Sequence, residues 1–396
     1  MVPGAPDEVQ AYRDLIAAFQ AASPGLAVDL ITIPTRADYD RRVAADFGAG
    51  RAADVLVLDY RRVTGYAVRG LLAPVGPFLA GSTAIAEGDF YREVVYPYYL
   101  GRELMCLPQH ASGLVVYYNR RLFDAAGVPY PDGTWDWEGF LATAQALTAD
   151  TDGDGLTDVY GLGAEVSLAN ALPFIWQNQG ELVDNLLLPR LMEIDQPATV
   201  EAVQWFGDWQ ARYGVAPGAA AEAAEPSEAR FMAGRLAMYL NTRRGVGAYR
   251  PLADLDWDVA PLPSHRGRRT NLLFSDGYCM AATAADKPAA WRFIEYAASA
   301  EGQAILAATG RLFPSRADAA EAVVAQEAAL RPAHGVVFAD TVPRLQPAPA
   351  LENWVEIEVI VTDEIQNVFY GRLPAVQAMR VAALRTEEYL RFQVVN

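Results

Sequence analysis

Residues 26–34 have the sequence Leu-Ala-Val-Asp-Leu-Ile-Thr-Ile-Pro, and residues 54–58 have the sequence Asp-Val-Leu-Val-Leu. Their length and apolar content predict two strands, the first of them buried and ending at the proline. Apolar residues at helical spacing precede the first run, at 9–19, and separate it from the second, at 39–47. This alternation of helices and strands indicates an α/β fold with a mostly parallel sheet.

The alternation continues along the rest of the chain. Further strands are predicted at 113–118, 257–263 and 277–282, and further helices at 136–147, 200–213, 288–309 and 376–383. A chain of 396 residues exceeds the size at which a single hydrophobic core stops growing, so we expect two lobes. No evident linker separates two contiguous halves, which indicates lobes that exchange chain segments.

The bulk composition excludes several classes of protein. Hydrophobic residues make up 52% and charged residues 20% of the chain, which argues against long disorder. The formal net charge is −17, and a surface that acidic repels phosphate backbones and anionic lipids. We therefore expect no nucleic acid partner and no direct membrane binding. No stretch is apolar enough to span a bilayer, and residues 1–8 lack the features of a signal peptide.

The two cysteines, Cys106 and Cys279, are in neither a metal-binding spacing nor a Cys-x-x-Cys motif. Two interpretations remain open. We favour two buried thiols that pack in a core. The alternative is a disulfide, which needs an oxidising compartment and a fold that brings the two residues close together.

The most specific local motif is the acidic run at 150–158, Asp-Thr-Asp-Gly-Asp-Gly-Leu-Thr-Asp. Carboxylates at alternate positions followed by glycine match the first half of a calcium loop. The glutamate that completes an EF-hand loop is missing, because Gly161 stands at the twelfth position. A structural calcium site and a solvated acidic turn therefore both stay open. The metal ligands would be Asp150, Asp152, Asp154, the carbonyl of Leu156, and Asp158.

The chain carries no recognisable catalytic motif. It lacks a nucleophile elbow, a zinc-binding His-Glu-x-x-His helix, a P-loop and a dinucleotide fingerprint. Its three histidines, His110, His265 and His334, are far apart in sequence. Acidic residues are abundant, but their context singles out no pair for glycoside hydrolysis. We therefore expect a binding protein with no catalytic residues, rather than an enzyme.

Several aromatic residues stand where predicted strands or helices end. Tyr60 follows the strand at 54–58, Trp176 lies next to two amide residues, and Trp354 follows an asparagine. Ligands of open α/β sheets bind beyond the carboxyl ends of the strands. Aromatic faces together with hydrogen-bonding side chains suit a sugar. Packing in a core is the alternative for each of these rings.

The ordered set of segments resembles the family 1 extracellular solute-binding proteins, which include maltose- and other sugar-binding proteins. Residues 19–25, Phe-Gln-Ala-Ala-Ser-Pro-Gly, resemble the opening of that family, and 117–119, Tyr-Tyr-Asn, resemble its crossover between lobes. The other matching segments are 53–55, 70–74, 122–123, 126–127, 134–137, 233–238, 310–316 and Trp354. Each motif alone has low specificity, but together they cover nearly the whole chain in the right order.

The resemblance implies a two-lobed periplasmic-binding-protein-like fold of type II, in which each lobe is a mixed sheet flanked by helices and hinge crossovers connect the lobes. Lobe one is expected at 1–112 and 270–312, and lobe two at 113–269 and 313–396. The implied function is capture of a mono- or oligosaccharide in an interlobe cleft by closure of the lobes, as the substrate-binding component of an ABC transporter.

The resemblance also implies export, a permease as partner, a monomeric binding protein, and a lipid anchor on a precursor that carries the signal sequence. The family starts with a strand ahead of the first helix, and we expect that truncation has removed it here. The candidate ligand-binding residues, at family site positions, are Asp59, Tyr60, Gln109, His110, Trp176, Gln177, Asn178, Asn241, Arg243, Asp276 and Trp354.

Two alternatives stay open. One is a glycan-active hydrolase on an α/β scaffold, which needs two carboxyl groups across one pocket. The other keeps the fold and changes the ligand to a polyol phosphate, a polyamine or a peptide. A phosphate calls for a cluster of basic residues, and Arg243 with Arg244 is the one such pair near an expected site loop.

Overall fold

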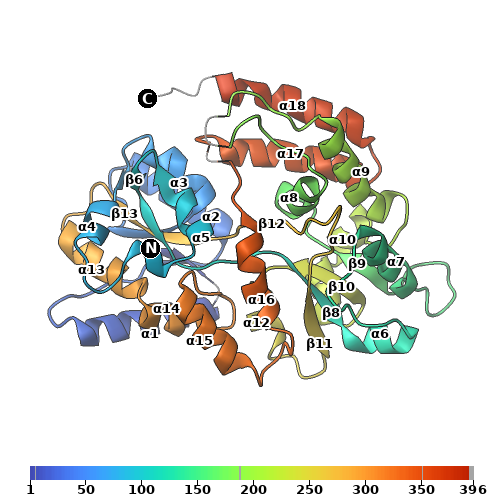
Figure 1. Ribbon diagram of the computed structural model, residues 1–396, viewed down its shortest axis with the longest axis horizontal. Helices are drawn as coiled ribbons and strands as arrows, with labels where there is room; N and C mark the ends of the chain where they lie inside the picture. Colours follow the sequence, from blue (N-terminus) through green and yellow to red (C-terminus); the bar gives the residue numbers. More distant parts are fainter. Residues whose placement is uncertain (5, 187–188, 350, 392–396) are drawn as a thin grey trace. The chain divides into compact units, whose positions relative to one another are not determined.

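The computed structural model describes residues 1–4, 6–186, 189–349 and 351–391, which form two compact units (Figure 1). Unit 1 contains Met1–Ser112, Leu273–Gln326 and residues 351–352. Unit 2 contains Gly113–Leu272, Glu327–Pro349 and residues 353–391. The units exchange chain segments, as the absence of a linker indicated.

The boundaries differ from the expected ranges in three places, one of which is the short segment 351–352, expected in lobe two but packed in unit 1. Residues 313–326, which the sequence assigned to lobe two, pack in unit 1, where the Ser315 hydroxyl donates a hydrogen bond to the Pro108 carbonyl at 2.7 Å. Residues 270–272, assigned to lobe one, lie in unit 2, because strand β12 (Asn271–Leu272) pairs within that unit. The chain therefore returns to unit 2 later than the sequence suggested.

Unit 1 contains an antiparallel sheet of four strands and a separate pair of parallel strands. Its strands are β1 (Val2–Pro3), β2 (Thr32–Ile33), β3 (Val55–Asp59), β4 (Leu72–Ala73), β7 (Cys106–Pro108) and β13 (Asp276–Ala281), beside a hairpin of β5 (Tyr99–Leu100) and β6 (Glu103–Leu104). β13 is antiparallel to β3, β4 and β7, while β1 pairs in parallel with β2. The Met1 amino group donates to the Val55 carbonyl at 2.7 Å, which connects β1 to β3.

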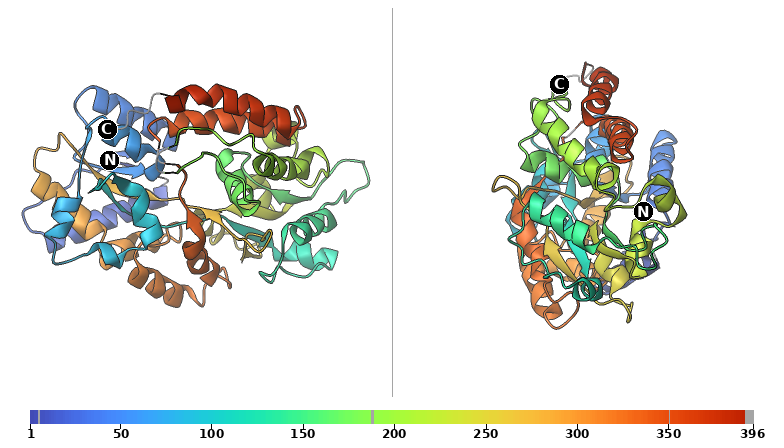
Figure 2. Two further views of the ribbon diagram at one scale, coloured as in Figure 1. Left: turned by 45° about the horizontal axis from the view of Figure 1, so that its top comes forward. Right: turned by 90° about the vertical axis from the view of Figure 1, so that its right-hand side faces the viewer.

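Helices cover this sheet. They are α1 (Pro6–Ala22), α2 (Arg36–Gly48), α3 (Tyr60–Ala67), α4 (Gly76–Ala80), α5 (Arg92–Val95), α13 (Lys287–Ala297), α14 (Ala300–Ala307) and α15 (Ala317–Glu327), with 3₁₀ turns η1 (Glu87–Asp89) and η2 (Tyr96–Tyr98). α1 packs against α13 and α14 (Figure 2). Asp59 ends β3 and also caps α3, because its side chain accepts the Arg61 backbone N–H.

Unit 2 contains a mixed sheet, in the order β11-β8-β10-β9. Its strands are β8 (Val115–Asn119), β9 (Tyr160–Gly163), β10 (Leu236–Asn241) and β11 (Trp257–Pro261), and β12 pairs separately with β14 (Leu345–Gln346). β8 is antiparallel to both of its neighbours. The prediction of a mostly parallel sheet is wrong, because β8 and β13 each follow a passage between the units rather than a helical crossover. The prediction of a type II α/β fold is confirmed, with a mixed sheet in unit 2 and antiparallel strands beside a parallel pair in unit 1.

The helices of unit 2 are α6 (Arg120–Ala126), α7 (Trp137–Leu147), α8 (Leu168–Gln177), α9 (Pro197–Ala211), α10 (Ala219–Ala224), α11 (Ser227–Met232), α12 (Arg244–Tyr249), α16 (Val336–Thr341), α17 (Trp354–Phe369) and α18 (Ala375–Arg391), with a 3₁₀ turn η3 (Val342–Arg344). α9, α17 and α18 pack against one another (Figure 1). In the part of the chain that the structure describes, every helix is too short or too polar to cross a membrane.

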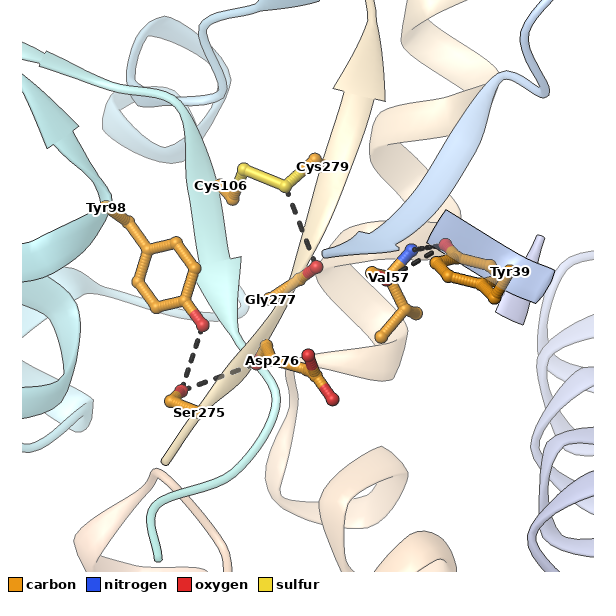
Figure 3. Close-up of a disulfide and its surroundings, with 8 residues drawn as sticks. All are labelled: Tyr39, Val57, Tyr98, Cys106, Ser275, Asp276, Gly277 and Cys279. Atoms are coloured by element: carbon orange, nitrogen blue, oxygen red, sulfur yellow. Dashed lines mark hydrogen bonds between the residues drawn. A yellow bond between two sulfur atoms is a disulfide. The ribbon is translucent and has the colours of Figure 1, made fainter. Parts of the chain in front are cut away.

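Cys106 and Cys279 form a disulfide between neighbouring strands (Figure 3). The two residues are register partners on β7 and β13, with Cα atoms 4.4 Å apart, and both side chains are fully buried. The favoured interpretation of two separate thiols is wrong, because the sheet brings together residues that are 173 positions apart.

Candidate functional site

Charged side chains of unit 1 cluster where β3 ends and the antiparallel strand β13 begins. Asp59 and Asp276 are register partners at this end of the sheet. Two adjacent carboxylates repel each other unless cations lie nearby, and guanidinium groups from three positions supply them. This charged cluster consists of Arg36, Asp40, Asp59, Arg61, Arg62 and Asp276.

Both central carboxylates are held in two-point contacts. Asp276 accepts hydrogen bonds from Nη1 and Nη2 of Arg36 at 3.1 and 2.9 Å. Asp59 accepts from Nε and Nη2 of Arg61 at 3.0 and 2.7 Å. Such bidentate pairs fix the orientation of both groups as well as their charge.

The third carboxylate balances the cluster. Asp40 lies 3.4 Å from Nε of Arg36 and 2.8 Å from Nη2 of Arg62. Three carboxylates thus face three guanidiniums, and the cluster carries no net formal charge. It presents ordered hydrogen-bond donors and acceptors rather than a surplus of either sign.

The surrounding charges keep the two central carboxylates ionised. Burial alone would raise the pKa of Asp276, but Arg36 and His110 hold it well below its ordinary value. Burial likewise acts against ionisation of Asp59, and Arg61 brings its pKa below the ordinary value. Both groups therefore accept hydrogen bonds at neutral pH and donate none.

The other predicted site residues of unit 1 surround Asp276. The backbone N–H of Gln109 donates to the Asp276 carbonyl at 2.7 Å, and the N–H of Asp276 donates to Nε2 of His110 at 3.1 Å. The N–H of Tyr60 donates to the Ser275 carbonyl at 3.2 Å. Asp59, Tyr60, Gln109, His110 and Asp276 are therefore neighbours.

The side chains of Gln109 and His110 differ in their hydrogen-bond partners. The side chain of Gln109 donates to the hydroxyls of Tyr12 and Tyr278, at 2.8 and 2.9 Å, so it supports the core rather than facing solvent. Nε2 of His110 accepts the N–H of Asp276 and lies 3.6 Å from the Asp276 carboxylate, while its Nδ1 is buried. Within the described residues, this buried Nδ1 has no hydrogen-bond partner.

In unit 2, the predicted amides Gln177 and Asn178 at the end of α8 are fully buried and are bonded within the unit. Gln177 accepts from Nε1 of Trp137 at 2.9 Å and donates to the Thr270 carbonyl at 3.2 Å. Asn178 donates to the Ala198 carbonyl at 2.8 Å. Both amides have a structural role here.

The two predicted residues at the end of β10, Asn241 and Arg243, are also bonded to other side chains of the protein. Asn241 donates to Oε1 of Glu228 and to the hydroxyl of Tyr249, at 3.1 and 2.9 Å. Arg243 is 2% exposed and pairs with Glu327 at 2.7 Å. A buried guanidinium that is already paired with a carboxylate is a weak candidate for binding an anionic ligand.

The two predicted tryptophans are buried, Trp176 to 3% and Trp354 to 1% exposure. The indole N–H of each has no partner among the described residues. Tryptophan N–H groups normally find an acceptor when they are buried. The exposed fractions agree with the core alternative, and the core residues Trp209 and Trp257 likewise have an indole N–H without a partner among the described residues.

Four members of the charged cluster were not among the predicted site residues: Arg36, Asp40, Arg61 and Arg62. Arg36 follows the predicted strand at 26–33, and Arg61 and Arg62 follow the strand at 54–58. The rule that ligands bind beyond strand ends could therefore have singled out the arginines. No comparable signal marks Asp40, which lies one turn into α2.

The acidic loop at 150–158 brings part of the predicted ligand set together. Asp150, Asp152 and Asp158 each offer a carboxylate oxygen, and these atoms lie within 4.8 Å of one another. Asp154 is outside this group, and Leu156 is 69% exposed.

The carboxylates of Asp150 and Asp158 already accept hydrogen bonds from groups within this loop. Asp150 accepts the N–H groups of Gly155 and Gly153, at 2.8 and 2.7 Å, which lowers its pKa. Asp158 accepts from the hydroxyl and N–H of Thr151, at 2.5 and 2.7 Å. The geometry therefore suits a self-capped turn as well as a cation.

Comparison with known proteins shows the same fold. An ABC substrate-binding protein of Listeria monocytogenes, solved in complex with cycloalternan, has a TM-score of 0.90 at 20% identity, over 99% of this chain and 98% of its own. The GacH receptor of Streptomyces glaucescens has a TM-score of 0.84 at 20% identity, over 99% and 98% of the two chains, and was solved unliganded and with acarbose. UgpB of Mycobacterium tuberculosis, in complex with glycerophosphocholine, has a TM-score of 0.84 at 20% identity, over 100% and 98% of the chains.

Sequence comparison agrees with the structures. A binding protein of Brucella abortus, whose name states no ligand, is 22% identical over 96% of this chain and 90% of its own length. Residues 5–304 match the family model described as bacterial extracellular solute-binding protein. That match spans well over half of the chain, and it confirms the resemblance seen in the motifs. The chain belongs to the bacterial extracellular solute-binding protein family.

Proposed function

We propose that the protein is the substrate-binding component of an ABC transporter and that it captures a carbohydrate. The observation that carries the proposal is the charged cluster of unit 1, where three carboxylates and three guanidiniums balance one another. Sugar hydroxyls both donate and accept hydrogen bonds, so they suit an array of fixed acceptors and donors without net charge. Cycloalternan and acarbose, the ligands of two similar structures, support this class of ligand.

A phosphorylated ligand is the second candidate, because the similar UgpB structure contains glycerophosphocholine. A phosphate requires uncompensated guanidinium or ammonium groups. Here Arg36 and Arg61 are each paired with a carboxylate, and Arg243 is paired with Glu327. The charge balance therefore favours a neutral ligand over an anionic one.

The same geometry favours binding without catalysis. A glycosidase needs one carboxyl group with a raised pKa as the general acid. The pKa values of Asp59 and Asp276 are both lowered. Burial raises the pKa of Asp40, but this residue is tied to two arginines. We therefore include the absence of enzymatic activity in the proposal.

The disulfide of unit 1 supports a location outside the cytosol. Disulfides persist in oxidising compartments and are rare in the cytosol. The Cys106–Cys279 bridge and the extracellular family thus support a periplasmic or extracellular location. A lipid anchor on the precursor, a monomeric state and a membrane permease as partner complete the proposal.

The test is a melting-temperature screen, since a ligand that binds the native state raises its stability by mass action. The screen compares neutral oligosaccharides, polyol phosphates and polyamines. A neutral sugar should raise the melting temperature, and titration calorimetry should then give its affinity. Asp276→Asn should weaken that affinity at least tenfold, whereas Asp132→Asn, an exposed aspartate of unit 2, should not. A response to phosphate esters alone would contradict the neutral-ligand proposal.

A further inference from the structure

A small cavity of unit 2 lies beside two short strands from which the chain continues into unit 1. Strand β12 ends at Leu272, one residue before the chain enters unit 1, and β14 is followed by residues 351–352 of that unit. The two strands pair in parallel, with Asn271 opposite Leu345. The cavity has a volume of about 90 Å³, and the described residues that line it all belong to unit 2.

Two arginines that stand ahead of these strands line the cavity. Arg269 precedes β12 by two positions, and Arg344 immediately precedes β14. Nη2 of Arg269 donates to the Gly133 carbonyl at 2.6 Å, and Nη1 of Arg344 donates to the Asp340 carbonyl. Each guanidinium is therefore positioned by a neutral carbonyl rather than by a carboxylate.

The Nε–H of Arg269 is a hydrogen-bond donor that the protein does not use. It is buried, and among the described residues it has no partner. A buried donor of a charged group that has lost its water is costly until an acceptor reaches it. In the part of the chain that the structure describes, neither Arg269 nor Arg344 forms an ion pair with a carboxylate. The acceptor must therefore come from outside the chain, as a water or as an anion.

The charges around the cavity favour an anion over water as that acceptor. Burial, and secondly the Arg344 guanidinium, lower the pKa of Arg269 below its ordinary value. Among the described residues that line the cavity, Asp340 carries the one carboxylate, and it is exposed. Two guanidiniums beside one carboxylate leave a local surplus of positive charge. An anion would offset this surplus and the repulsion between the arginines, whereas water would offset neither.

The size and the walls of the cavity define the class of anion. Pro261, Leu262 and Val337 contribute apolar surface, and ionic contacts are stronger beside surfaces of low polarity. The volume is far below the roughly 300 Å³ at which pockets for drug-sized ligands begin. It therefore suits a small ion and is too small for a nucleotide or an oligosaccharide. Guanidinium N–H groups match the paired oxygens of carboxylates and phosphates, which favours an oxyanion over a monatomic ion.

We propose that this cavity is a binding site for a small oxyanion, a phosphate or a carboxylate, that bridges Arg269 and Arg344 of unit 2. The anion accepts the unused Nε–H of Arg269 and contacts the guanidinium of Arg344. Because these arginines precede β12 and β14, the bound anion ties together the two segments that lead to unit 1. The site shares no residue with the charged cluster, so the inference is independent of the proposed function.

The first test is titration calorimetry of the full chain with inorganic phosphate and with acetate, at an ionic strength held constant with chloride. The parent protein should bind at least one of the two anions, and Arg269→Gln and Arg344→Gln should each weaken that binding at least tenfold. Arg268→Gln, which removes an exposed positive charge from the same loop, should change it less than twofold. Absence of binding in the parent, or an equal loss in Arg268→Gln, would overturn the proposal.

Hydrogen exchange tests the bridge between the two segments. Addition of the anion that binds should slow exchange of the β12 and β14 amides at least threefold in the parent and leave it unchanged in Arg344→Gln. Arg344 is exposed, so this variant decides the outcome even if Arg269→Gln fails to fold. Binding without slower exchange would show that the anion does not tie the segments together. Loss of sugar affinity in Asp276→Asn tests the proposed function separately, because Asp276 belongs to unit 1.

Discussion

Asp59 and Asp276 lie opposite each other at the ends of β3 and β13, and each is bound by a different arginine. The strands that carry them are separated by more than two hundred positions in sequence. Their pairing depends on the sheet, so the two carboxylates come together only when unit 1 has folded.

Replacing Asp276 should lower the unfolding free energy by an amount that depends on pH. Asp276→Asn leaves Arg36 without its bidentate partner, so we expect a loss of about 1–3 kcal/mol of unfolding free energy at pH 7. The folded pKa of Asp276 is lowered, so the stabilisation is present above the unfolded pKa of about 3.9 and disappears as the pH falls toward the folded pKa. Urea unfolding at pH 7 and pH 3 measures it. A difference between the proteins that stays constant with pH would contradict the linkage.

The buried amino terminus predicts a second pH dependence. Burial lowers the pKa of the Met1 amino group from 8.0 to about 5. Between these values the unfolded chain binds a proton that the folded chain does not, so stability should fall as the pH drops from 8 to 5. Chemical acetylation of Met1 should remove this component from the melting curves. If acetylated and free forms keep the same slope, the amine is not buried in solution.

Loss of the disulfide should destabilise unit 1. The Cys106→Ala/Cys279→Ala double variant should lose about 2–4 kcal/mol of unfolding free energy, because the bridge closes a long loop in the unfolded chain. Denaturant unfolding of the variant, compared with the oxidised and reduced parent, measures the loss. The reduced parent serves as the control, since it keeps both side chains. Equal stability of all three forms would show that the bridge is not made.

The tryptophans distinguish a core role from a ligand-binding role. Because Trp176 and Trp354 are almost fully buried, Trp176→Ala and Trp354→Ala should each lose about 3–5 kcal/mol of unfolding free energy. Phenylalanine at either position keeps an aromatic ring but removes the second ring of the indole together with the unpartnered N–H. Affinity for the sugar found in the screen should be measured beside the denaturation midpoints. A large loss of affinity with unchanged stability would instead indicate stacking on the ligand.

The acidic loop predicts a structural calcium site. Convergence of Asp150, Asp152 and Asp158 should give heat on titration with calcium after chelation, and a higher melting temperature. Asp152→Asn should abolish both effects, and Asp132→Asn should leave them unchanged. Absence of heat in the parent protein would leave the loop as a turn that Asp150 and Asp158 cap through their own hydrogen bonds.

Local patterns predicted local features well. The helix predicted at 136–147 forms as α7, with Asp136 as its N-cap, and the apolar runs at 54–58 and 113–118 form strands. Residues 26–31 show the limit of such patterns, because a strand also needs a partner along its edge. The disulfide and the pairing of Asp59 with Asp276 depend on β13, whose position no nearby residue encodes. Gln177 and Arg243 have the right chemistry for a site, but their partners come from distant segments that the sequence does not reveal.

The place of β13 in unit 1 also determines when that unit can fold during synthesis. β13 pairs with β3, β4 and β7, yet it ends at Ala281, long after those strands have left the ribosome. Contacts of such large sequence separation form slowly, because a long loop must close before they stabilise the fold. The first 112 residues of a nascent chain therefore lack their central strand while they emerge. The hydrogen bonds that join β3, β4 and β7 to β13 can therefore form only after residue 281 has been synthesised, which makes unit 1 dependent on a late part of the chain.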